Sequence, residues 1–364
     1  MEIGQPNFAA MLAAKFYEPT LEDLASEIDR ILRKHFSCSA MPARQVGIGV
    51  LCHEYEPETL EATIEREAQV TREVAEQVAH LIRARDTDNY HRPSCRYLNQ
   101  TERQASLQSF WSSLRGDELD PVKLNDNNAN NAVGRALEMI ERRAPQAFRW
   151  LEAGTPLWRG RADENFSLWE AVQADGYCAL GAHPNGRANR LNPEGIRCFY
   201  GANDVQTALS ELRVETGWII YLGNFTLTRN VPILDLQLLK QAPWPSVFAG
   251  DYKEQAYEVG VIRGIPNELA HAPWKGGGDH VYRPARYFAE FCRQRQSDRI
   301  AGLLYPSSQH PSGFNIALFA DKWDGSNDPI RLTSIHTTQI LSRTTRARGV
   351  DVCLDGVDPL DTDE

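Results

Sequence analysis

Hydrophobic residues recur at helical spacing through about the first 145 residues of the chain. Thr20 and Asp23 have the spacing of a helix-capping pair, and an apolar stripe at three- and four-residue intervals follows them. Residues 59–85 repeat this pattern opposite a face of Glu and Arg, and shorter helical stretches follow over residues 101–114 and 131–143. The pattern predicts a helical N-terminal region whose charged faces are solvated.

The pattern changes near residue 150, where short apolar runs typical of strands begin to alternate with helical stretches. Expected strands include residues 218–222, 231–235, 301–305 and 315–319. This mixed order predicts an α+β fold built on a twisted sheet. We expect three parts, which are a helical domain over residues 1–148, a mixed α/β domain over residues 149–345, and an acidic, disordered tail over residues 346–364.

The composition is that of a protein able to bury a core, since 42% of the 364 residues are apolar and 24% are charged. The net charge of −10 argues against a nucleic-acid surface, although it allows a local basic pocket. Seven scattered cysteines without a C-x-x-C pair predict reduced thiols and no metal site. We find neither a secretion signal nor a membrane span, so the cytoplasm is the expected location.

The stretch from Arg190 to Glu211, R-L-N-P-E-G-I-R-C-F-Y-G-A-N-D-V-Q-T-A-L-S-E, combines groups that can hold and cleave a charged nucleotide. A turn over residues 192–195 precedes a strand over residues 196–200, which ends in a tyrosine. Asp204 then stands where it can cap the next helix. The apolar positions of that helix place Glu211 on a buried or half-buried face, where a carboxylate needs a partner or a function.

Two further motifs occur in order with this stretch. L-W-R-G-R occupies residues 157–161, and G-L-L-Y-P-S-S-Q-H-P-S-G-F-N-I-A-L-F occupies residues 302–319. Together the three resemble the RES domain, a bacterial family of NAD-consuming toxins named for its Arg, Glu and Ser, across about residues 154–338. A fourth fragment, Y-R-P-A-R-Y-F-A-E-F-C at residues 282–292, resembles the helix before the serine strand, with Arg286 where the family pattern has an uncharged amide.

The resemblance implies a fold similar to that of ADP-ribosyltransferases, with a cleft between two sheets. It also implies cleavage of the bond between nicotinamide and ribose in NAD, which is then a substrate and not a cofactor. Nicotinamide departs as a neutral molecule, so no general acid is required. Positive charge develops on the ribose, and one carboxylate can stabilise it. Glu211 is the candidate for this role, and a structural ion pair is the alternative.

The two phosphates of NAD need hydrogen-bond donors, and arginine presents a planar, permanently charged fork that matches phosphate oxygens. Motif position selects Arg159 and Arg190 for this binding role. Arg161, Arg187 and Arg197 are alternatives, and the sequence R-A-N-R at residues 187–190 leaves the second assignment open.

Two hydroxyl groups complete the predicted site. The ring of Tyr200 can stack on nicotinamide or ribose and its hydroxyl can donate a hydrogen bond, although strand tyrosines are often core residues. Ser307 can bond a ribose hydroxyl or orient Glu211, and Ser308 is the competing assignment. We do not expect a serine nucleophile, because His310 lies on the same loop and no oxyanion motif accompanies it.

The resemblance implies an NAD glycohydrolase or phosphorylase that acts as a growth-arresting toxin or a defence effector triggered by infection. A protein ADP-ribosyltransferase would use the same site. In a non-catalytic nucleotide-binding sensor, Glu211 would only pair with an arginine. An enzyme that destroys NAD must be restrained, and two means are expected. One is an inhibitory antitoxin protein, as RES toxins have, and the other is the N-terminal helices, with homo-oligomerisation as one way in which they could act.

The N-terminal helices suggest a third hypothesis, in which this region cleaves RNA. Arg30 and His35 have the R-x-x-x-x-H spacing of HEPN-type ribonucleases, and Arg85 with His91 gives a looser version. Two residues at such spacing arise readily by chance. HEPN-like domains precede some RES domains, so we expect a structural, regulatory or oligomerising role for this region ahead of RNA cleavage.

Overall fold

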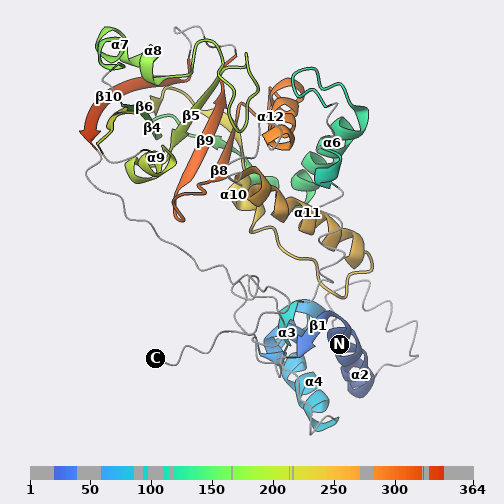
Figure 1. Cartoon of the computed structure of the whole chain (residues 1–364). Helices are drawn as coiled ribbons and strands as arrows, with labels where there is room; N and C mark the ends of the chain where they lie inside the picture. The colour runs from blue at the N-terminus through green and yellow to red at the C-terminus, as the bar shows by residue number, and fades with distance from the viewer. Residues whose placement is uncertain are drawn as a thin grey trace, which may run out of the picture.

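The computed structural model describes residues 20–38, 59–85, 93–96, 110–114, 119–164, 167–212, 214, 217–270, 282–321, 323 and 328–339. Helices accompany an eight-stranded mixed sheet, which confirms the predicted α+β class (Figure 1). The expected tail over residues 346–364 lies outside the described residues. None of the described helices is both long and apolar enough to span a membrane.

The main sheet has the strand order β10-β6-β4-β5-β9-β8-β7-β3. Its strands are β3 (Phe148–Leu151), β4 (Pro156–Asp163), β5 (Cys198–Ala202), β6 (Ile219–Leu227), β7 (Val231–Asp235), β8 (Gly302–Pro306), β9 (Phe314–Phe319) and β10 (Ile330–Gln339). Neighbouring strands pair antiparallel except β7 and β8, which are parallel. Four strands expected from the sequence correspond to β6, β7, β8 and β9. The fifth, expected over residues 196–200, is β5, which begins at Cys198 and runs to Ala202, so Tyr200 lies in its middle and not at its end. A second, two-stranded sheet joins β1 (Phe36–Cys38) to β2 (Pro93–Arg96).

The centre of the main sheet contains a weak junction. β4 pairs with β6 from Pro156 to Asp163, along its whole length. Between β4 and β5, by contrast, Trp158 opposite Ala202 is the single paired position among the described residues of the two strands. The sheet is therefore continuous through this one pair, and the backbones of β4 and β5 lack further ladder hydrogen bonds to each other.

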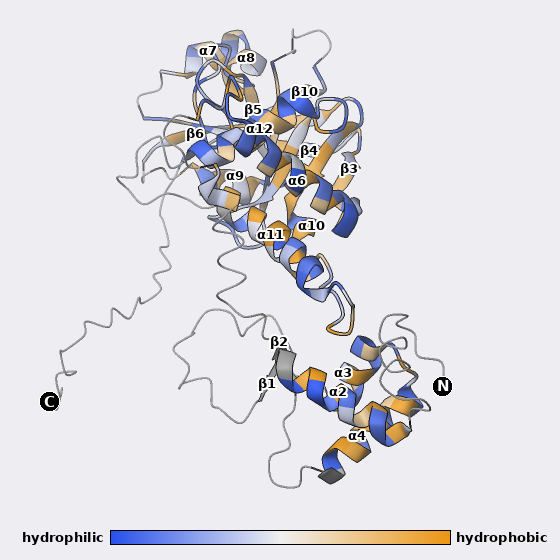
Figure 2. Ribbon diagram, turned by 90° about the vertical axis from the view of Figure 1, so that its right-hand side faces the viewer, coloured by the Kyte–Doolittle hydropathy of each residue, from blue (hydrophilic) through white to orange (hydrophobic). Residues whose placement is uncertain are grey.

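Hydrophobic residues gather in the strands of the sheet and in α11 (Figure 2). One face of the sheet packs against α6 (Asn127–Arg143), α10 (Leu236–Leu239), α11 (Tyr252–Ala270) and α12 (Arg283–Arg295). The other face packs against α7 (Trp169–Ala174) and α8 (Gly176–Leu180), through Val172 and Leu180. Because α6 buries its apolar stripe in the same core as α11 and α12, residues before 148 help to build that core, and the domain boundary stays a prediction.

Among the described residues, α2, α3 and α4 precede this core, and α2 and α3 begin where the sequence predicts. α2 (Leu21–His35) starts with a reciprocal capping box, in which the backbone nitrogens of Thr20 and Asp23 each donate to the other residue's side chain, at 3.1 and 3.2 Å. The single helix expected over residues 59–85 is instead two, α3 (Leu60–Ala68) and α4 (Arg72–Arg85). The break occurs because Gln69 adopts a left-handed conformation, with φ of 52°, which ends α3. Of the helix expected over 101–114, residues 101–109 lie outside the described ranges.

The N-terminal helices pack against the segment that leads into α11 (Figure 1). Phe248 and Tyr252 are buried with the apolar residues of α2, α3 and α4. The buried carboxylate of Glu67 on α3 accepts a hydrogen bond from the backbone nitrogen of Val247 at 3.0 Å and pairs with Arg66. α11 thus carries residues of two clusters, one shared with the N-terminal helices and one shared with the main sheet.

Candidate functional site

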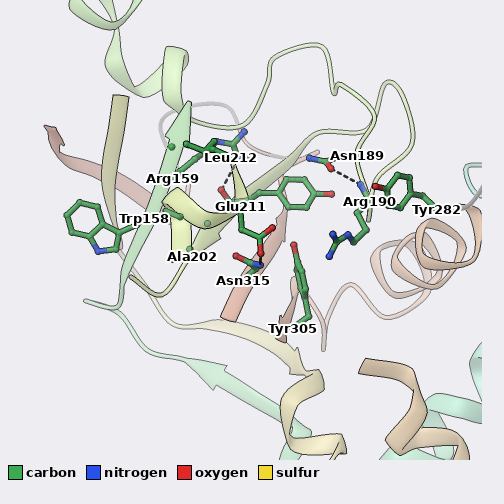
Figure 3. Close-up of a pocket in the computed structure, with 14 residues that line it drawn as sticks. Trp158, Arg159, Asn189, Arg190, Ala202, Glu211, Leu212, Tyr282, Tyr305 and Asn315 are labelled. Carbon is green, nitrogen blue, oxygen red and sulfur yellow. Dashed lines mark hydrogen bonds between the residues drawn. The ribbon is translucent and has the colours of Figure 1, made fainter. Parts of the chain in front are cut away.

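A cavity of about 310 Å³ lies beside the junction of β4 and β5. Four predicted site residues from separate parts of the chain line it, namely Arg159, Arg190, Tyr200 and Glu211 (Figure 3). Such a cavity, with a few polar groups converging on it, is the usual form of a small-molecule site. Its walls come from β4, β5, α9 (Val205–Glu211), β8, β9 and the loop before β5.

Glu211 is the last residue of α9, a helix that begins as the sequence predicts, since Asp204 caps it by accepting from the backbone nitrogen of Thr207 at 2.8 Å. The half-buried carboxylate of Glu211 accepts two hydrogen bonds on the same oxygen, Oε1. Ser307 Oγ donates at 2.6 Å and Asn315 Nδ2 donates at 2.7 Å. Among the described residues Glu211 forms no ion pair, so its charge is not neutralised by an arginine.

Ser307 lies at the start of the loop between β8 and β9, which is folded tightly around its hydroxyl. Besides donating to Glu211, Oγ accepts from the backbone nitrogens of Gln309 and His310, at 3.1 and 3.0 Å. Ser308, the competing assignment, is exposed and accepts from the side chain of Gln309. The geometry therefore places Ser307, and not Ser308, on the carboxylate.

The serine loop is also attached to the beginning of α9. His310 Nδ1 lies 2.9 Å from Thr207 Oγ1, and this hydroxyl in turn donates to Asp204 at 2.7 Å. The approach is so close that a Cβ on Gly313 would lie 2.1 Å from Thr207 Oγ1, which explains the glycine at this position. Both ends of α9 are thus tied to the loop that carries Ser307.

Arg159 extends from β4 toward β5. Its Nη1 donates to the backbone oxygen of Tyr200 at 2.9 Å, and its guanidinium lies 5.4 Å from the centroid of the Phe199 ring. Burial, followed by the nearby charge of Arg161, lowers the pKa of Arg159 to about 10, so the side chain remains charged at neutral pH. The buried Nε atoms of Arg159 and Arg161 both lack a partner among the described residues. Buried donors without a partner are uncommon in folded proteins, and of these two arginines only Arg159 lines the cavity.

The loop before β5 presents Arg190, and not Arg187, to the cavity. Asn192 shapes this loop, because its Nδ2 donates to the backbone oxygens of Arg187 and Ile196 at 2.9 and 2.8 Å. The hydroxyl of Tyr200 donates to Asn192 Oδ1 at 2.7 Å. Burial raises the pKa of Tyr200 well above its usual value, so the hydroxyl stays a donor at neutral pH. Tyr200 therefore offers its ring to the cavity while its hydroxyl holds the loop.

Arg286, the residue that departs from the expected pattern, belongs to the support of this loop. It is buried on α12, donates through Nε to the backbone oxygen of Asn189 at 2.7 Å, and lies 5.6 Å from the centroid of the Tyr282 ring. Asn189 precedes Arg190 directly, so Arg286 holds the loop next to Arg190. The remaining alternatives face elsewhere, since Arg161 donates to Gly181 and Arg197 to Trp323.

The residues that line the cavity but were not predicted as site residues include Tyr282, Tyr305 and Asn315, whereas the predicted Ser307 lies behind Glu211 and does not line it. Burial raises the pKa of Tyr305, with Arg190 opposing and Glu211 adding to the shift, so its hydroxyl is neutral between these two charges. The signal for Asn315 was a lone amide in the apolar strand F-N-I-A-L-F, where burial requires a hydrogen-bond partner. In the N-terminal helices Arg30 pairs with Glu27 at 2.5 Å, and the side chains of His35, Arg85 and His91 lie outside the described residues.

Within the described ranges no group of three His, Cys, Asp or Glu side chains is arranged to hold a metal ion. The family model described as the RES domain matches residues 156–341, just over half of the 364-residue chain. The matched range contains every residue that lines the cavity. The comparison with curated proteins finds no match.

Proposed function

Because the chain belongs to the RES domain family, we propose that it destroys NAD by cleaving the bond between nicotinamide and ribose. The observation that carries this proposal is that Glu211, Arg159 and Arg190 line the same cavity. The carboxylate of Glu211 has no ion pair among the described residues. A carboxylate beside two cationic side chains is suited to a substrate that is anionic at its diphosphate and becomes cationic at its ribose. The expected cleft between two sheets is replaced by a cavity beside the β4–β5 junction of one continuous sheet, because the Trp158–Ala202 pair joins the two strands.

In the proposed reaction the electron pair of the glycosidic C–N bond moves to the nicotinamide nitrogen, which leaves as a neutral pyridine. Positive charge develops at the ribose carbon and is stabilised by Glu211. A nucleophile then forms the new bond at that carbon. With water the products are nicotinamide, ADP-ribose and a proton, whereas with inorganic phosphate the sugar product is a phosphorylated ADP-ribose.

The two arginines are proposed to hold the diphosphate, whose charge changes little during the reaction, so they act on affinity more than on the chemical step. The rings of Tyr200 and Tyr282 line the same cavity and can stack on the nicotinamide or the ribose. In this proposal Arg159 on β4 and Arg190 on the loop before β5 bind the diphosphate, and Glu211 on α9 acts on the ribose.

The mass of the sugar product tests the proposed function and identifies the acceptor. Purified protein is incubated with NAD in the presence and absence of phosphate, and separately with candidate acceptor proteins. We expect release of nicotinamide together with ADP-ribose or its phosphorylated form. Protein-linked ADP-ribose would instead identify an ADP-ribosyltransferase. Saturable NAD binding without nicotinamide release would contradict the proposal and favour a nucleotide sensor.

Arg190→Ala should raise the Michaelis constant for NAD by about 10- to 100-fold with little change in kcat, as expected for loss of a hydrogen bond from a charged donor. Arg187→Ala is the matched control, because Arg187 belongs to the same loop but does not line the cavity. Steady-state kinetics of both variants provide the measurement. Normal kinetics in Arg190→Ala together with a defect in Arg187→Ala would reverse the assignment.

We also propose a toxin or defence role, an inhibitory protein partner and a homo-oligomer. These three proposals rest on membership of the RES domain family. Their shared physical reason is that uncontrolled NAD destruction would harm the cell that makes the enzyme. Light scattering on the purified chain tests self-association. Co-purification of a second protein that lowers NAD turnover when added back tests for an inhibitor.

A further inference from the structure

We infer that Asn315 is a positioning residue for Glu211, which together with Ser307 fixes the carboxylate oxygen Oε1 so that Oε2 is presented to the ribose. The inference rests on the proposed function. Its structural basis is the pair of hydrogen bonds that Oε1 accepts, at 2.6 Å from Ser307 Oγ and at 2.7 Å from Asn315 Nδ2, whose side chain lies beside Glu211 in Figure 3. Within the described residues, Oε2 accepts no hydrogen bond.

Asn315 is well suited to hold another side chain in place, because its own backbone is fixed on both sides. It lies in β9, opposite Ala202 of β5 and Tyr305 of β8. Only 6% of the residue is exposed, and its neighbours along β9 are apolar. A buried amide is unfavourable without a hydrogen bond. The hydrogen bond to Glu211 satisfies the Asn315 amide and so makes an asparagine acceptable in this apolar strand.

The chemical identity of the two donors matters as much as their position. A hydroxyl and an amide are neutral, so they orient the carboxylate without cancelling its charge. An arginine at either place would supply a competing positive charge and weaken the attraction between the carboxylate and a cationic ribose. With both donors on Oε1, the carboxylate plane is held from β9 and from the serine loop, while the second oxygen remains available in the cavity.

Two anchors also restrict the side-chain rotations of Glu211. Glu211 is the last residue of the seven-residue helix α9. A glutamate at such a position has several accessible rotamers, and misplacement of a reacting group by about 1 Å can cost about a hundredfold in rate. Ser307 and Asn315 select the rotamer before substrate arrives.

A double-mutant cycle tests the inference in the full-length chain. Asn315→Leu keeps a similar volume but removes the donor, and it is made in the wild-type protein and in Glu211→Gln. In the wild type we expect kcat to fall about 10- to 100-fold with the Michaelis constant within about twofold. In Glu211→Gln the same substitution should have almost no further effect, because the charge through which Asn315 acts is already lost.

Two further variants keep the test decisive. Asn130→Leu removes a comparable amide that bonds to Leu124 and Tyr287 away from the cavity, and it should lower the melting temperature while kcat stays near wild type. If Asn315→Leu fails to fold, Asn315→Asp replaces it, since this isosteric side chain turns a donor into an acceptor facing Glu211 and should reduce kcat at least as much.

Wild-type kcat in the folded Asn315 variant, or equal losses in both backgrounds, would overturn the inference while the wild-type enzyme still consumed NAD. Absence of NAD turnover by the wild type would instead remove the proposed function itself. The two failures are therefore distinguishable in one set of assays.

Discussion

Glu211→Gln should bind NAD normally but turn it over about a hundredfold more slowly, or worse. The substitution keeps the size of the side chain and an oxygen that can accept from Ser307 and Asn315, but it removes the negative charge. Loss of one electrostatic stabiliser of a transition state typically reduces kcat by about 10²–10³. NAD affinity by calorimetry and nicotinamide release by chromatography measure the two effects separately.

The same variant provides the control for toxicity in cells. Expression of the wild-type chain should lower cellular NAD and arrest growth, whereas Glu211→Gln at equal abundance should do neither. Wild-type turnover in purified Glu211→Gln would show that another group stabilises the ribose cation. Growth arrest by both proteins would point to a cause other than NAD loss.

Phe248→Ala should destabilise the N-terminal helices by about 3 kcal/mol or more, the usual cost of deleting a buried phenylalanine side chain. Phe248 is 5% exposed and packs in the cluster shared by α2, α3, α4 and the start of α11. Denaturant unfolding and limited proteolysis provide the measurement. Tyr257→Ala is the control, because Tyr257 lies on α11, whose first residue Tyr252 belongs to this cluster, but is 43% exposed and should tolerate the change.

NAD turnover per folded molecule of Phe248→Ala then decides what the N-terminal helices do. An increase over wild type indicates that their contact with α11 restrains the enzyme, and a decrease indicates that the contact supports an active arrangement. Unchanged turnover in a protein whose N-terminal helices are measurably loosened would exclude both forms of control from within the chain. An external inhibitor would then be the remaining means of restraint.

Local signals in the sequence were sufficient for much of the fold and for part of the site. Short apolar runs identified β5 to β9, and Asp204 identified the start of α9, because both signals depend on neighbours within a few residues. The order of three short motifs was sufficient to group Glu211 with Ser307, which the structure places 2.6 Å apart. The role of each residue in chemistry stays a prediction.

The rest depends on contacts between residues far apart in the chain. Gln69 gave no local sign that it would end α3, since glutamine is not a typical left-handed residue. Arg286 could not be assigned without knowing that α12 lies against the loop at Asn189, nearly a hundred residues earlier. The contact of Phe248 with the N-terminal helices likewise joins segments that share no motif.

The single pairing between β4 and β5 predicts that binding of a nucleotide changes amide hydrogen exchange in these two strands. Among the described residues of these two strands, the backbones are joined only at Trp158 and Ala202, so amide hydrogens along the remaining facing edges are not protected by a ladder between them. A nucleotide held by Arg159 on β4 and by Glu211 beyond β5 would bridge the two parts of the sheet. Slower amide exchange on β4 and β5 would then accompany binding, with β6 and β9 little changed.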